Sequence, residues 1–334
     1  MINRQSVIYL KSLLFAFLGG CLALYLNIPL PWMLGPLFIV GIASAIKLDM
    51  QIPITPIPVC RAILGCAIGA NFSPDVLYRA QEIGFSLIIL PLFILIMISS
   101  TALFLNKIMK FDFQTSIFGS LPGGLNEMVI ISKELGVNPR TMTLIHSTRI
   151  VVVVFFASIA MYIYPSDLTD TSRNIHLFQY SDQLISVILV SFFGYLIGKL
   201  IKLPGYTITG PMIFSASLHV LGIVNAMPIY LLIIIVQVVL GSVLGTQFKN
   251  ITLKDLYGPV LSGIVTTFIA LIILLVFIII LLELDYNLIS IILSYSPGGQ
   301  SEMNLLALSV DADMAFISTH HMFRVFMVII LAAI

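Results

Sequence analysis

The side chains best suited to chemistry in this sequence are ionisable groups inside long apolar segments. A charged side chain at the centre of a membrane helix costs about 2.5–3.5 kcal/mol, so such residues are rare unless they have a partner or a role. The residues of this kind that we consider for binding are Arg61, Glu127, His146, Arg149, Glu302, His321 and Arg324. Arginine presents a fork of N–H donors that suits carboxylates, and a buried glutamate can carry a proton. The set predicts a site for a small solute or ion, with a leaning towards anions.

Two of the histidines stand three residues before an arginine: His146 precedes Arg149, and His321 precedes Arg324. Residues three apart lie on the same face of a helix, so each pair can act together. A structural interpretation competes with ligand binding. A histidine inside a membrane often satisfies a main-chain carbonyl, and the arginines fit a structural role at least as well as a binding one.

The two glutamates each follow a Pro-Gly-Gly sequence by three residues. Glu127 follows Gly123-Gly124, and Glu302 follows Gly298-Gly299. A helix that starts at the second glycine presents free N–H groups and the positive end of its dipole in its first turn. Such a turn is suited to an anion or a polar solute. Pairing of each glutamate with an arginine, which would hold the segment in place, is an equally good interpretation.

The composition indicates which elements must position these residues. Hydrophobic residues make up 59% of the 334 positions, charged residues only 9%, and the mean hydropathy is +1.11. Ordinary domains are about 25% charged, so we expect an all-α integral membrane protein in contact with the lipid bilayer. The net charge of +1 and the scattered Lys and Arg give no reason to expect nucleic acid. Three cysteines in apolar segments predict packing, and we expect no metal and no cofactor.

The chain matches itself at an offset of 175 residues. The matching residues are mostly Gly, Pro, Glu, His and Arg, which are scarce or costly in membranes, so the match is strong support for an internal repeat. Gly35-Pro36 matches Gly210-Pro211, Pro122-Gly123-Gly124 matches Pro297-Gly298-Gly299, Glu127-Met128 matches Glu302-Met303, and His146 and Arg149 match His321 and Arg324. We therefore expect a first membrane repeat over 1–165, a polar linker over 166–182 and a second repeat over 183–334. Arg61 has Gln237 as its counterpart and His320 has Ile145, so these two break the repeat.

Each half contains six apolar segments. They span 6–26, 31–46, 54–72, 84–105, 113–135 and 141–163 in the first half, and 183–201, 206–223, 228–247, 259–282, 287–309 and 314–334 in the second. The first run contains Lys11 and lacks a small-residue cleavage site, so we expect it to be retained as a helix. The Gly65-x-x-x-Gly69 and Gly241-x-x-x-Gly245 spacings predict tight helix packing.

The fifth segment of each half has Pro-Gly-Gly at its centre and is therefore either a broken helix that crosses or a hairpin that returns. If both return and the N-terminus is inside, ten Lys and Arg residues fall inside and only Arg79 and Arg173 fall outside. This bias satisfies the positive-inside rule. We expect about ten transmembrane helices plus two re-entrant or broken helices, in two repeats of inverted topology. Both termini would be cytoplasmic, in the inner membrane of a bacterium.

These motifs resemble a known family. Pro31-Trp32-Met33-Leu34-Gly35-Pro36, Leu121-Pro122-Gly123-Gly124 with Glu127-Met128, and Ser296-Pro297-Gly298-Gly299 with Glu302-Met303 are similar to the AbrB family of bacterial membrane proteins. This is the duplicated membrane family, not the DNA-binding transition-state regulator of the same name. Its members often carry the label ammonia monooxygenase or regulator of gene expression. A more distant resemblance to cation–proton antiporters and anion transporters implies inverted five-helix repeats with interrupted helices.

Three functions follow from these observations. Inverted repeats with interrupted helices are a transporter construction, so the first is alternating-access movement of a small solute that is preferentially anionic. The second is a membrane sensor, or a transporter that affects gene expression indirectly. The third, a membrane monooxygenase, needs several converging His or carboxylate ligands, and an arginine one turn from each paired histidine opposes metal binding. We therefore expect a non-enzymatic protein with a solute as its partner, and the sequence leaves a homo-oligomer open.

Overall fold

The computed structural model describes residues 4–123, 128, 133, 136–163 and 183–333. Throughout this part of the chain the secondary structure is helical, without a β-strand. The predicted all-α class is therefore confirmed. The helices divide between two compact units, one formed by residues 1–74 and 158–251 and the other by 75–157 and 252–334.

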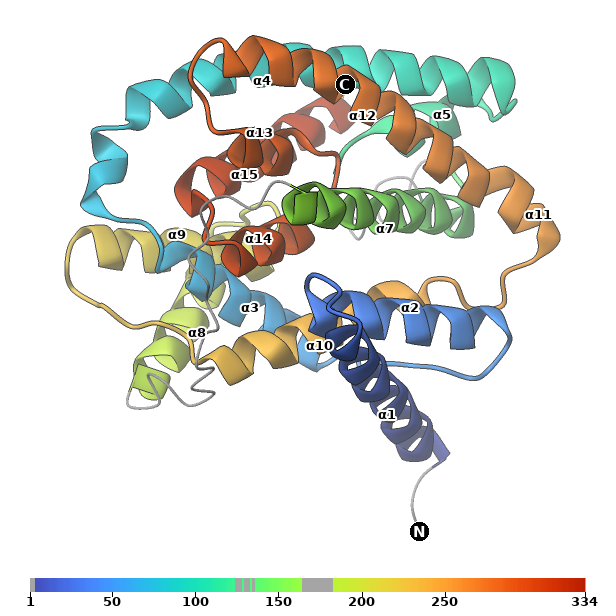
Figure 1. The fold of residues 1–334 in the computed structure, drawn as a ribbon, viewed down its shortest axis with the longest axis horizontal. Helices are drawn as coiled ribbons and strands as arrows, with labels where there is room; N and C mark the ends of the chain where they lie inside the picture. Colours follow the sequence, from blue (N-terminus) through green and yellow to red (C-terminus); the bar gives the residue numbers. More distant parts are fainter. Residues whose placement is uncertain (1–3, 124–127, 129–132, 134–135, 164–182, 334) are drawn as a thin grey trace. The chain divides into compact units, whose positions relative to one another are not determined.

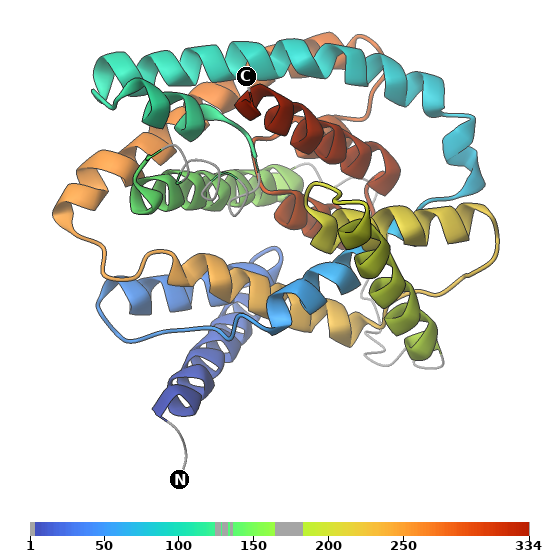
Figure 2. The same ribbon diagram turned by 180° about the vertical axis from the view of Figure 1, so that it is seen from behind.

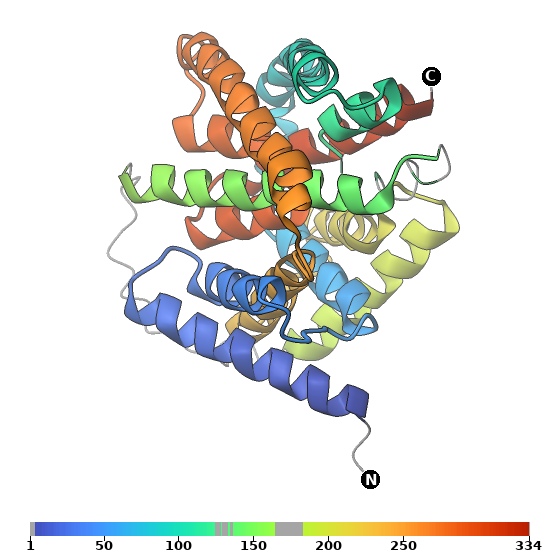
Figure 3. The ribbon, with the colours of Figure 1, turned by 90° about the vertical axis from the view of Figure 1, so that its right-hand side faces the viewer.

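Unit 1 contains the first three α-helices of each half of the sequence. These are α1 (Arg4–Tyr25), α2 (Pro31–Ala45), α3 (Pro56–Gly69), α8 (Leu184–Leu200), α9 (Tyr206–Val220) and α10 (Tyr230–Thr246). α1 packs against α2 (Figure 3), and α8 packs against α9 (Figure 2). The third helix of each half packs against the second helix of the other half, α3 on α9 and α10 on α2. The two halves of the sequence are thus interleaved within this unit.

Unit 2 contains the remaining elements of both halves. They are η1 (Pro74–Leu77, from Asp75), α4 (Ala80–Leu103), η2 (Phe104–Ile108), α5 (Phe113–Ser120), α7 (Pro139–Ile163, up to Ala157), α11 (Leu253–Asp255), η4 (Leu256–Val260), α12 (Leu261–Leu282), α13 (Leu288–Tyr295), α14 (Gln300–Ser309) and α15 (Met314–Ala333). Figure 1 draws the long helices α4 and α12 side by side at one edge of this unit. The compact units and the two sequence halves are therefore different divisions of the chain.

Glycines allow the helices of unit 1 to approach backbone to backbone. A Cβ built on Gly65 would lie 2.3 Å from Ile208 O on α9, and a Cβ on Gly241 would lie 2.3 Å from Met33 O on α2. A Cβ on Gly35 would lie 2.1 Å from Gly19 O on α1. Side chains at these positions would push the helices apart, which is the geometry of small-residue packing in membranes. The packing role predicted for the Gly-x-x-x-Gly spacings is confirmed.

One hydrophobic core cluster of unit 2 is built from α4, α12 and α13. Its largest buried side chains are aromatic: the Phe93 ring meets the Phe277 and Tyr295 rings edge-on, with centroids 5.2 and 5.4 Å apart. Edge-to-face contacts of this kind add to the stabilisation from burying the rings. The short helix α13 is thereby fixed against the two long helices.

Outward-facing side chains are apolar over much of the surface. Leu10 on α1, Ile88 on α4 and Ile185 on α8 are each at least 70% exposed. Within the described residues, five helices are long and apolar enough to cross a bilayer, and four apolar helices of 10–17 residues accompany them. Exposed aliphatic surface on such helices indicates contact with lipid, so the protein has the character of a membrane protein. The count of ten crossings stays a prediction.

Helix ends follow local signals close to the predicted positions. Proline occupies the start of α2 and of α3, where its missing N–H has no cost. Asp112 caps α5 by accepting hydrogen bonds from the backbone N and the hydroxyl of Thr115, at 2.9 and 2.6 Å. Asn287 caps α13 in the same way, accepting from the backbone N of Ile289 at 3.0 Å. The two helices that lead into the Pro-Gly-Gly sequences therefore begin at matching caps, 175 residues apart.

Replacing Asp112 by alanine is expected to lower the free energy of unfolding by about 1 kcal/mol near neutral pH. Hydrogen bonds from Thr115 hold the pKa of the Asp112 carboxyl below its ordinary value. The stabilisation is therefore complete above the ordinary aspartate pKa and is lost as the pH falls through the lowered one. Unfolding of the detergent-purified protein at several pH values measures this, with Asn287→Ala as the control because its cap does not titrate. A cost for Asp112→Ala that persists in acid would contradict the interpretation.

Candidate functional site

The candidate site is organised around an interrupted helix in the second half of the sequence and the equivalent helix end in the first half, both in unit 2. α13 ends at Tyr295 and α14 begins at Gln300, and Ser296 has extended backbone angles (φ −55°, ψ 135°). In the first half, α5 ends at Ser120 and Leu121 has nearly the same angles (φ −61°, ψ 129°). The break predicted at Pro-Gly-Gly is therefore present in the second half, and in the first half the helix stops at the equivalent residue. Gly124 and Glu127 lie outside the described residues.

In the second half, Arg324 and His321 of α15 hold the break in place. The Arg324 guanidinium donates to Ser296 O from Nη1 and to Gly298 O from Nη2, the second at 2.6 Å. Its Nη2 also lies 2.7 Å from His321 Nδ1, and His321 Nε2 lies 2.9 Å from Leu293 O. Both side chains are buried. The pair thus supplies donors to carbonyls at the end of α13 that no helix partner satisfies.

Arg149 and His146 of α7 repeat this arrangement in the first half. Arg149 Nη2 donates to Leu121 O at 2.8 Å and lies 2.9 Å from His146 Nδ1. His146 Nε2 lies 3.1 Å from Phe118 O. The carbonyl partners Phe118 and Leu121 match Leu293 and Ser296 at the same offset of 175 residues. We refer to these two arrangements as the Arg–His clamps.

The contacts of the clamps assign the proton on each imidazole. Nδ1 faces an arginine N–H, so it accepts, and Nε2 must then carry the proton that it donates to a carbonyl. Each histidine is therefore neutral with both ring nitrogens engaged, and each arginine provides the positive charge at the carbonyl end of a short helix, where the dipole favours a cation. Nε of both arginines has no hydrogen-bond partner within the part of the chain that the structure describes.

The double glycine and Glu302 form a close-packed turn. Glu302 is buried in the first turn of α14, and its carboxylate folds back so that a Cβ on Gly299 would lie 1.9 Å from Oε2. A Cβ on Gly298 would lie 2.9 Å from the terminal methyl carbon of Met303. In the first half, a Cβ on Gly123 would lie 2.6 Å from Met128 Cγ. The glycines therefore leave room for these side chains, whose flexible ends are the atoms that a Cβ would meet.

Two polar residues that the sequence argument did not single out lie in the same turn. Gln300 is the first residue of α14, and Asn304 follows one turn later and is wholly buried. The amide nitrogen of Asn304 donates to Gln300 O at 2.8 Å. The repeat does distinguish these two positions, because the matching residues of the first half are apolar, Leu125 and Val129.

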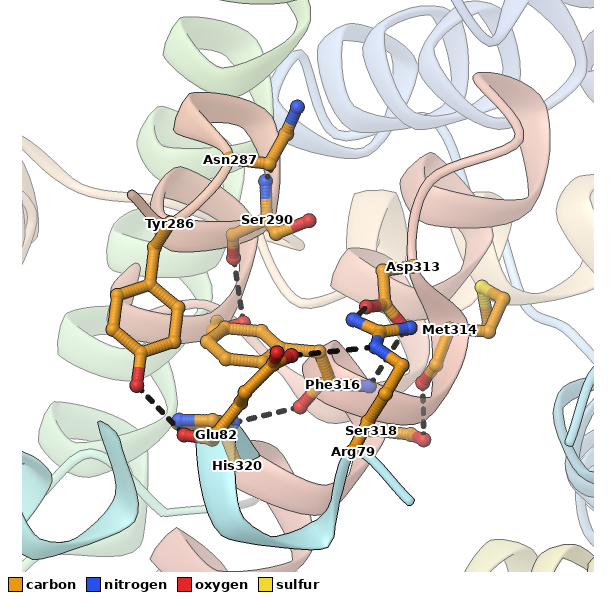
Figure 4. A network of polar contacts seen from close by, with 11 residues as sticks. Arg79, Glu82, Tyr286, Asn287, Ser290, Asp313, Met314, Phe316, Ser318 and His320 are labelled. Carbon is orange, nitrogen blue, oxygen red and sulfur yellow. Dashed lines mark hydrogen bonds and ion pairs between the residues drawn. The ribbon is translucent and has the colours of Figure 1, made fainter. Parts of the chain in front are cut away.

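A second polar network in unit 2 surrounds the start of α15 (Figure 4). Arg79 pairs with Asp313 and lies 3.6 Å from Glu82, and the hydrogen bond to Asp313 raises the pKa of Arg79. The Tyr286 hydroxyl donates to Glu82 O at 2.7 Å. Together these contacts join α15 and the loop before α13 to the start of α4.

His320 continues this polar network into the interior of unit 2. Its Nδ1 lies 2.7 Å from Phe316 O, and its Nε2 lies 2.9 Å from the Ser86 hydroxyl. The Tyr295 hydroxyl donates to Ser86 O at 2.7 Å. His320 has no histidine counterpart in the repeat, and it is one of three buried polar residues in contact, with Ser86 and Tyr295.

The structure distributes the predicted residues between the two units. Arg61 lies on α3 in unit 1 and is partly buried. The other described candidates all belong to unit 2, where one turn and its clamp bring together Gly298, Gly299, Glu302, His321 and Arg324. Among the described residues, no group of three or more His, Cys, Asp or Glu side chains is placed to hold a metal ion.

Comparison with known proteins identifies the family. The family model described as "Transition state regulatory protein AbrB" matches residues 32–334. The chain belongs to the AbrB family. It is similar to "Uncharacterized protein YhjN" of Bacillus subtilis (strain 168), with 25% identity over 340 residues that cover 94% of this chain and 88% of that protein. It is also similar to "Putative regulator AbrB" of Escherichia coli (strain K12), with 25% identity over 325 residues, 93% of this chain and 90% of the relative. The resemblance noted from the sequence motifs is therefore confirmed, and AbrB membership together with the apolar helices fits a membrane protein.

Proposed function

We propose that this AbrB-family chain is a secondary transporter that moves a small solute bearing a carboxylate group by alternating access. The observation that carries the proposal is the interrupted helix of the second half, held by a buried Arg–His clamp that recurs at the equivalent helix end of the first half. Each arm of the second break is short: α13 has 8 residues and α14 has 10, or about 12 and 15 Å at 1.5 Å per residue. Neither arm spans a hydrocarbon core of about 30 Å, so the N–H groups at the start of α14 lie near mid-membrane depth.

An ion pair in unit 1 supports a first fifth segment that returns without crossing. Lys249 Nζ lies 2.6 Å from Asp49 Oδ1. If the segment at 113–135 returns, the loops that carry these two residues lie on the same side of the membrane. If it crosses, they lie on opposite sides, separated by about 30 Å of hydrocarbon. Contact between them favours the returning form.

An ion pair in unit 2 supports the same form for the second fifth segment. Arg79 precedes α4, and its partner Asp313 follows the segment at 287–309. Once the first fifth segment returns, these residues share a side only if the second also returns. The two contacts together favour ten crossings and halves of opposite orientation, and the charge bias then places both termini in the cytoplasm of a bacterial inner membrane.

The division into units supports a mechanism of movement. Alternating access needs one body that carries the binding residues and another that moves against it. Unit 2 carries the break between α13 and α14 and the equivalent end of α5, and unit 1 is a set of six helices locked together through glycines. We assign the binding body to unit 2 and the scaffold to unit 1, with no enzymatic step and no cofactor.

Regulation is the second candidate, because the E. coli relative is named "Putative regulator AbrB". A transporter that changes the level of a metabolite would alter gene expression without contacting DNA. The monooxygenase label has less support, since each clamp uses both nitrogens of its histidine and places an arginine beside it. A metal ligand would have to give up one of these bonds.

Accessibility of the first turn of α14 tests the proposal. In a background without Cys21, Cys60 and Cys66, we expect Ser301→Cys to react with membrane-impermeant thiol reagents from both sides of the membrane, in proportions that a transported solute changes. Ser301 is suited to this because it is buried, so that a reagent reaches a cysteine there only when the protein opens to the side from which the reagent comes. Cysteine is also close to serine in size. Asp75→Cys serves as the marker of one face, and Lys110→Cys serves as the marker of the other. A cysteine that reacts from one face only, under every condition, would rule out alternating access.

A further inference from the structure

The first turn of α14 carries buried hydrogen-bonding groups without partners. The Asn304 side chain is 0% exposed, and its Oδ1 has no hydrogen-bond partner among the described residues. Gln300 Nε2 is also buried without a partner in that part of the chain. Buried polar atoms are nearly always satisfied, so an acceptor and a donor left over in one helix turn indicate a ligand that supplies their complements.

The geometry places both groups at the start of the helix. Helical side chains lean towards the N-terminus, and the bond from Asn304 Nδ2 to Gln300 O fixes the Asn304 amide beside the first turn. The N-cap, Gly299, has extended backbone angles and no side-chain cap. The spare donor, the spare acceptor and the positive end of a ten-residue helix therefore lie within one turn.

The repeat shows that the hairpin itself does not require these amides. The matching positions in the first half hold Leu125 and Val129, although the neighbouring Glu-Met sequence is shared by both halves. A purely structural need would have applied to both Pro-Gly-Gly segments. Amides at these two positions are therefore a feature of the second half alone, as expected for a solute site in an otherwise duplicated frame.

We propose that this turn binds the amino and carboxylate groups of a zwitterionic amino acid, an inference that rests on the proposed transport function. The carboxylate of the solute accepts from Gln300 Nε2 and from the free N–H groups of the helix start. Its ammonium group donates to Asn304 Oδ1. Glu302, buried in the same turn, supplies the negative charge that balances the ammonium and disfavours a simple carboxylate anion.

Thermal unfolding of the detergent-purified full chain tests this with matched probes. The first probes are the twenty common amino acids. Each amino acid that stabilises the protein is then compared with two analogues, one without the amino group and one with a hydroxyl in its place. For alanine these analogues are propionate and lactate. We expect the amino acid to raise the melting temperature and the des-amino acid to have little effect, because a ligand stabilises the state that binds it.

Two variants give the second half the apolar character of the first. In Asn304→Leu we expect affinity for the amino acid to fall roughly 10- to 100-fold, because a bond to a charged group is lost. Its melting temperature without solute should be equal to that of the unmodified chain or higher, since an unsatisfied buried group has been removed. Gln300→Leu should weaken binding as well. Ser309→Ala, at the exposed far end of α14, is the control and should change neither.

Four outcomes would overturn the inference. The des-amino acid could stabilise the protein as much as the amino acid does, or none of the amino acids could bind. The protein could respond to NaCl but not to choline chloride and to no solute, or Asn304→Leu could be destabilised while amino acid binding is unchanged. Each leaves the transport proposal standing if Ser301→Cys still changes its accessibility from one face to the other. A fixed accessibility of Ser301→Cys with intact amino acid binding would instead make the protein an amino acid sensor.

Discussion

Replacing Arg324 by methionine is expected to lower the free energy of unfolding by roughly 3–5 kcal/mol, the range for removing one partner of a buried charged network. The substitution keeps the length and apolar stem but removes every donor of the clamp. It leaves Ser296 O, Gly298 O and His321 Nδ1 buried without their donor. Arg324→Lys should recover only part of the loss, because a single ammonium group cannot reach both carbonyls in the manner of a planar fork.

Unfolding in mixed detergent, followed by circular dichroism, measures this effect. Arg149→Met is the matched variant, since Arg149 makes the equivalent bonds to Leu121 O and His146 Nδ1. Arg140→Met is the control, because Arg140 forms an exposed ion pair with Asp255 and should cost at most about 1 kcal/mol. A stable Arg324→Met protein that had lost only solute binding would show that the arginine is held for the ligand and not for the fold.

Gly65→Ala is expected to destabilise unit 1 by about 1–3 kcal/mol or more, as overpacking does in well-filled interiors. The added methyl carbon would lie 2.3 Å from Ile208 O, which is main chain and cannot rotate away. α3 and α9 would have to separate along their contact, and the loss of close packing would spread to neighbouring turns.

Two other glycine substitutions make this result specific. Gly241→Ala places its methyl 2.3 Å from Met33 O and should have a similar cost, because α10 packs on α2 as α3 packs on α9. Gly84→Ala, within α4, meets nothing within 4 Å and should be neutral or stabilising by up to about 1 kcal/mol, since alanine favours helix over glycine. Equal effects of all three substitutions on thermal unfolding would contradict a packing role for Gly65 and Gly241.

Much of the candidate site was predictable because its signals are local. Pro297-Gly298-Gly299 predicts an interrupted helix from three adjacent residues, and α13 and α14 end and begin on either side of it. The three-residue spacing of His321 and Arg324 likewise predicts one shared face. What the arginine binds could not be predicted, because its carbonyl partners lie 26 and 28 residues away and both a solute and main chain offer suitable acceptors.

The sequence by itself determined the membrane character, the helices, the positions of the breaks and the family motifs, since hydropathy and helix termination depend on neighbouring residues. Only the tertiary structure decided how the two halves divide into units, because that follows from helix contacts made over long distances in the chain. It also decided that the clamps serve backbone carbonyls, and that Gln300 and Asn304 are left with unused hydrogen-bonding atoms. Burial gives a polar atom its energetic weight, and burial is known only when the neighbouring helices are in place.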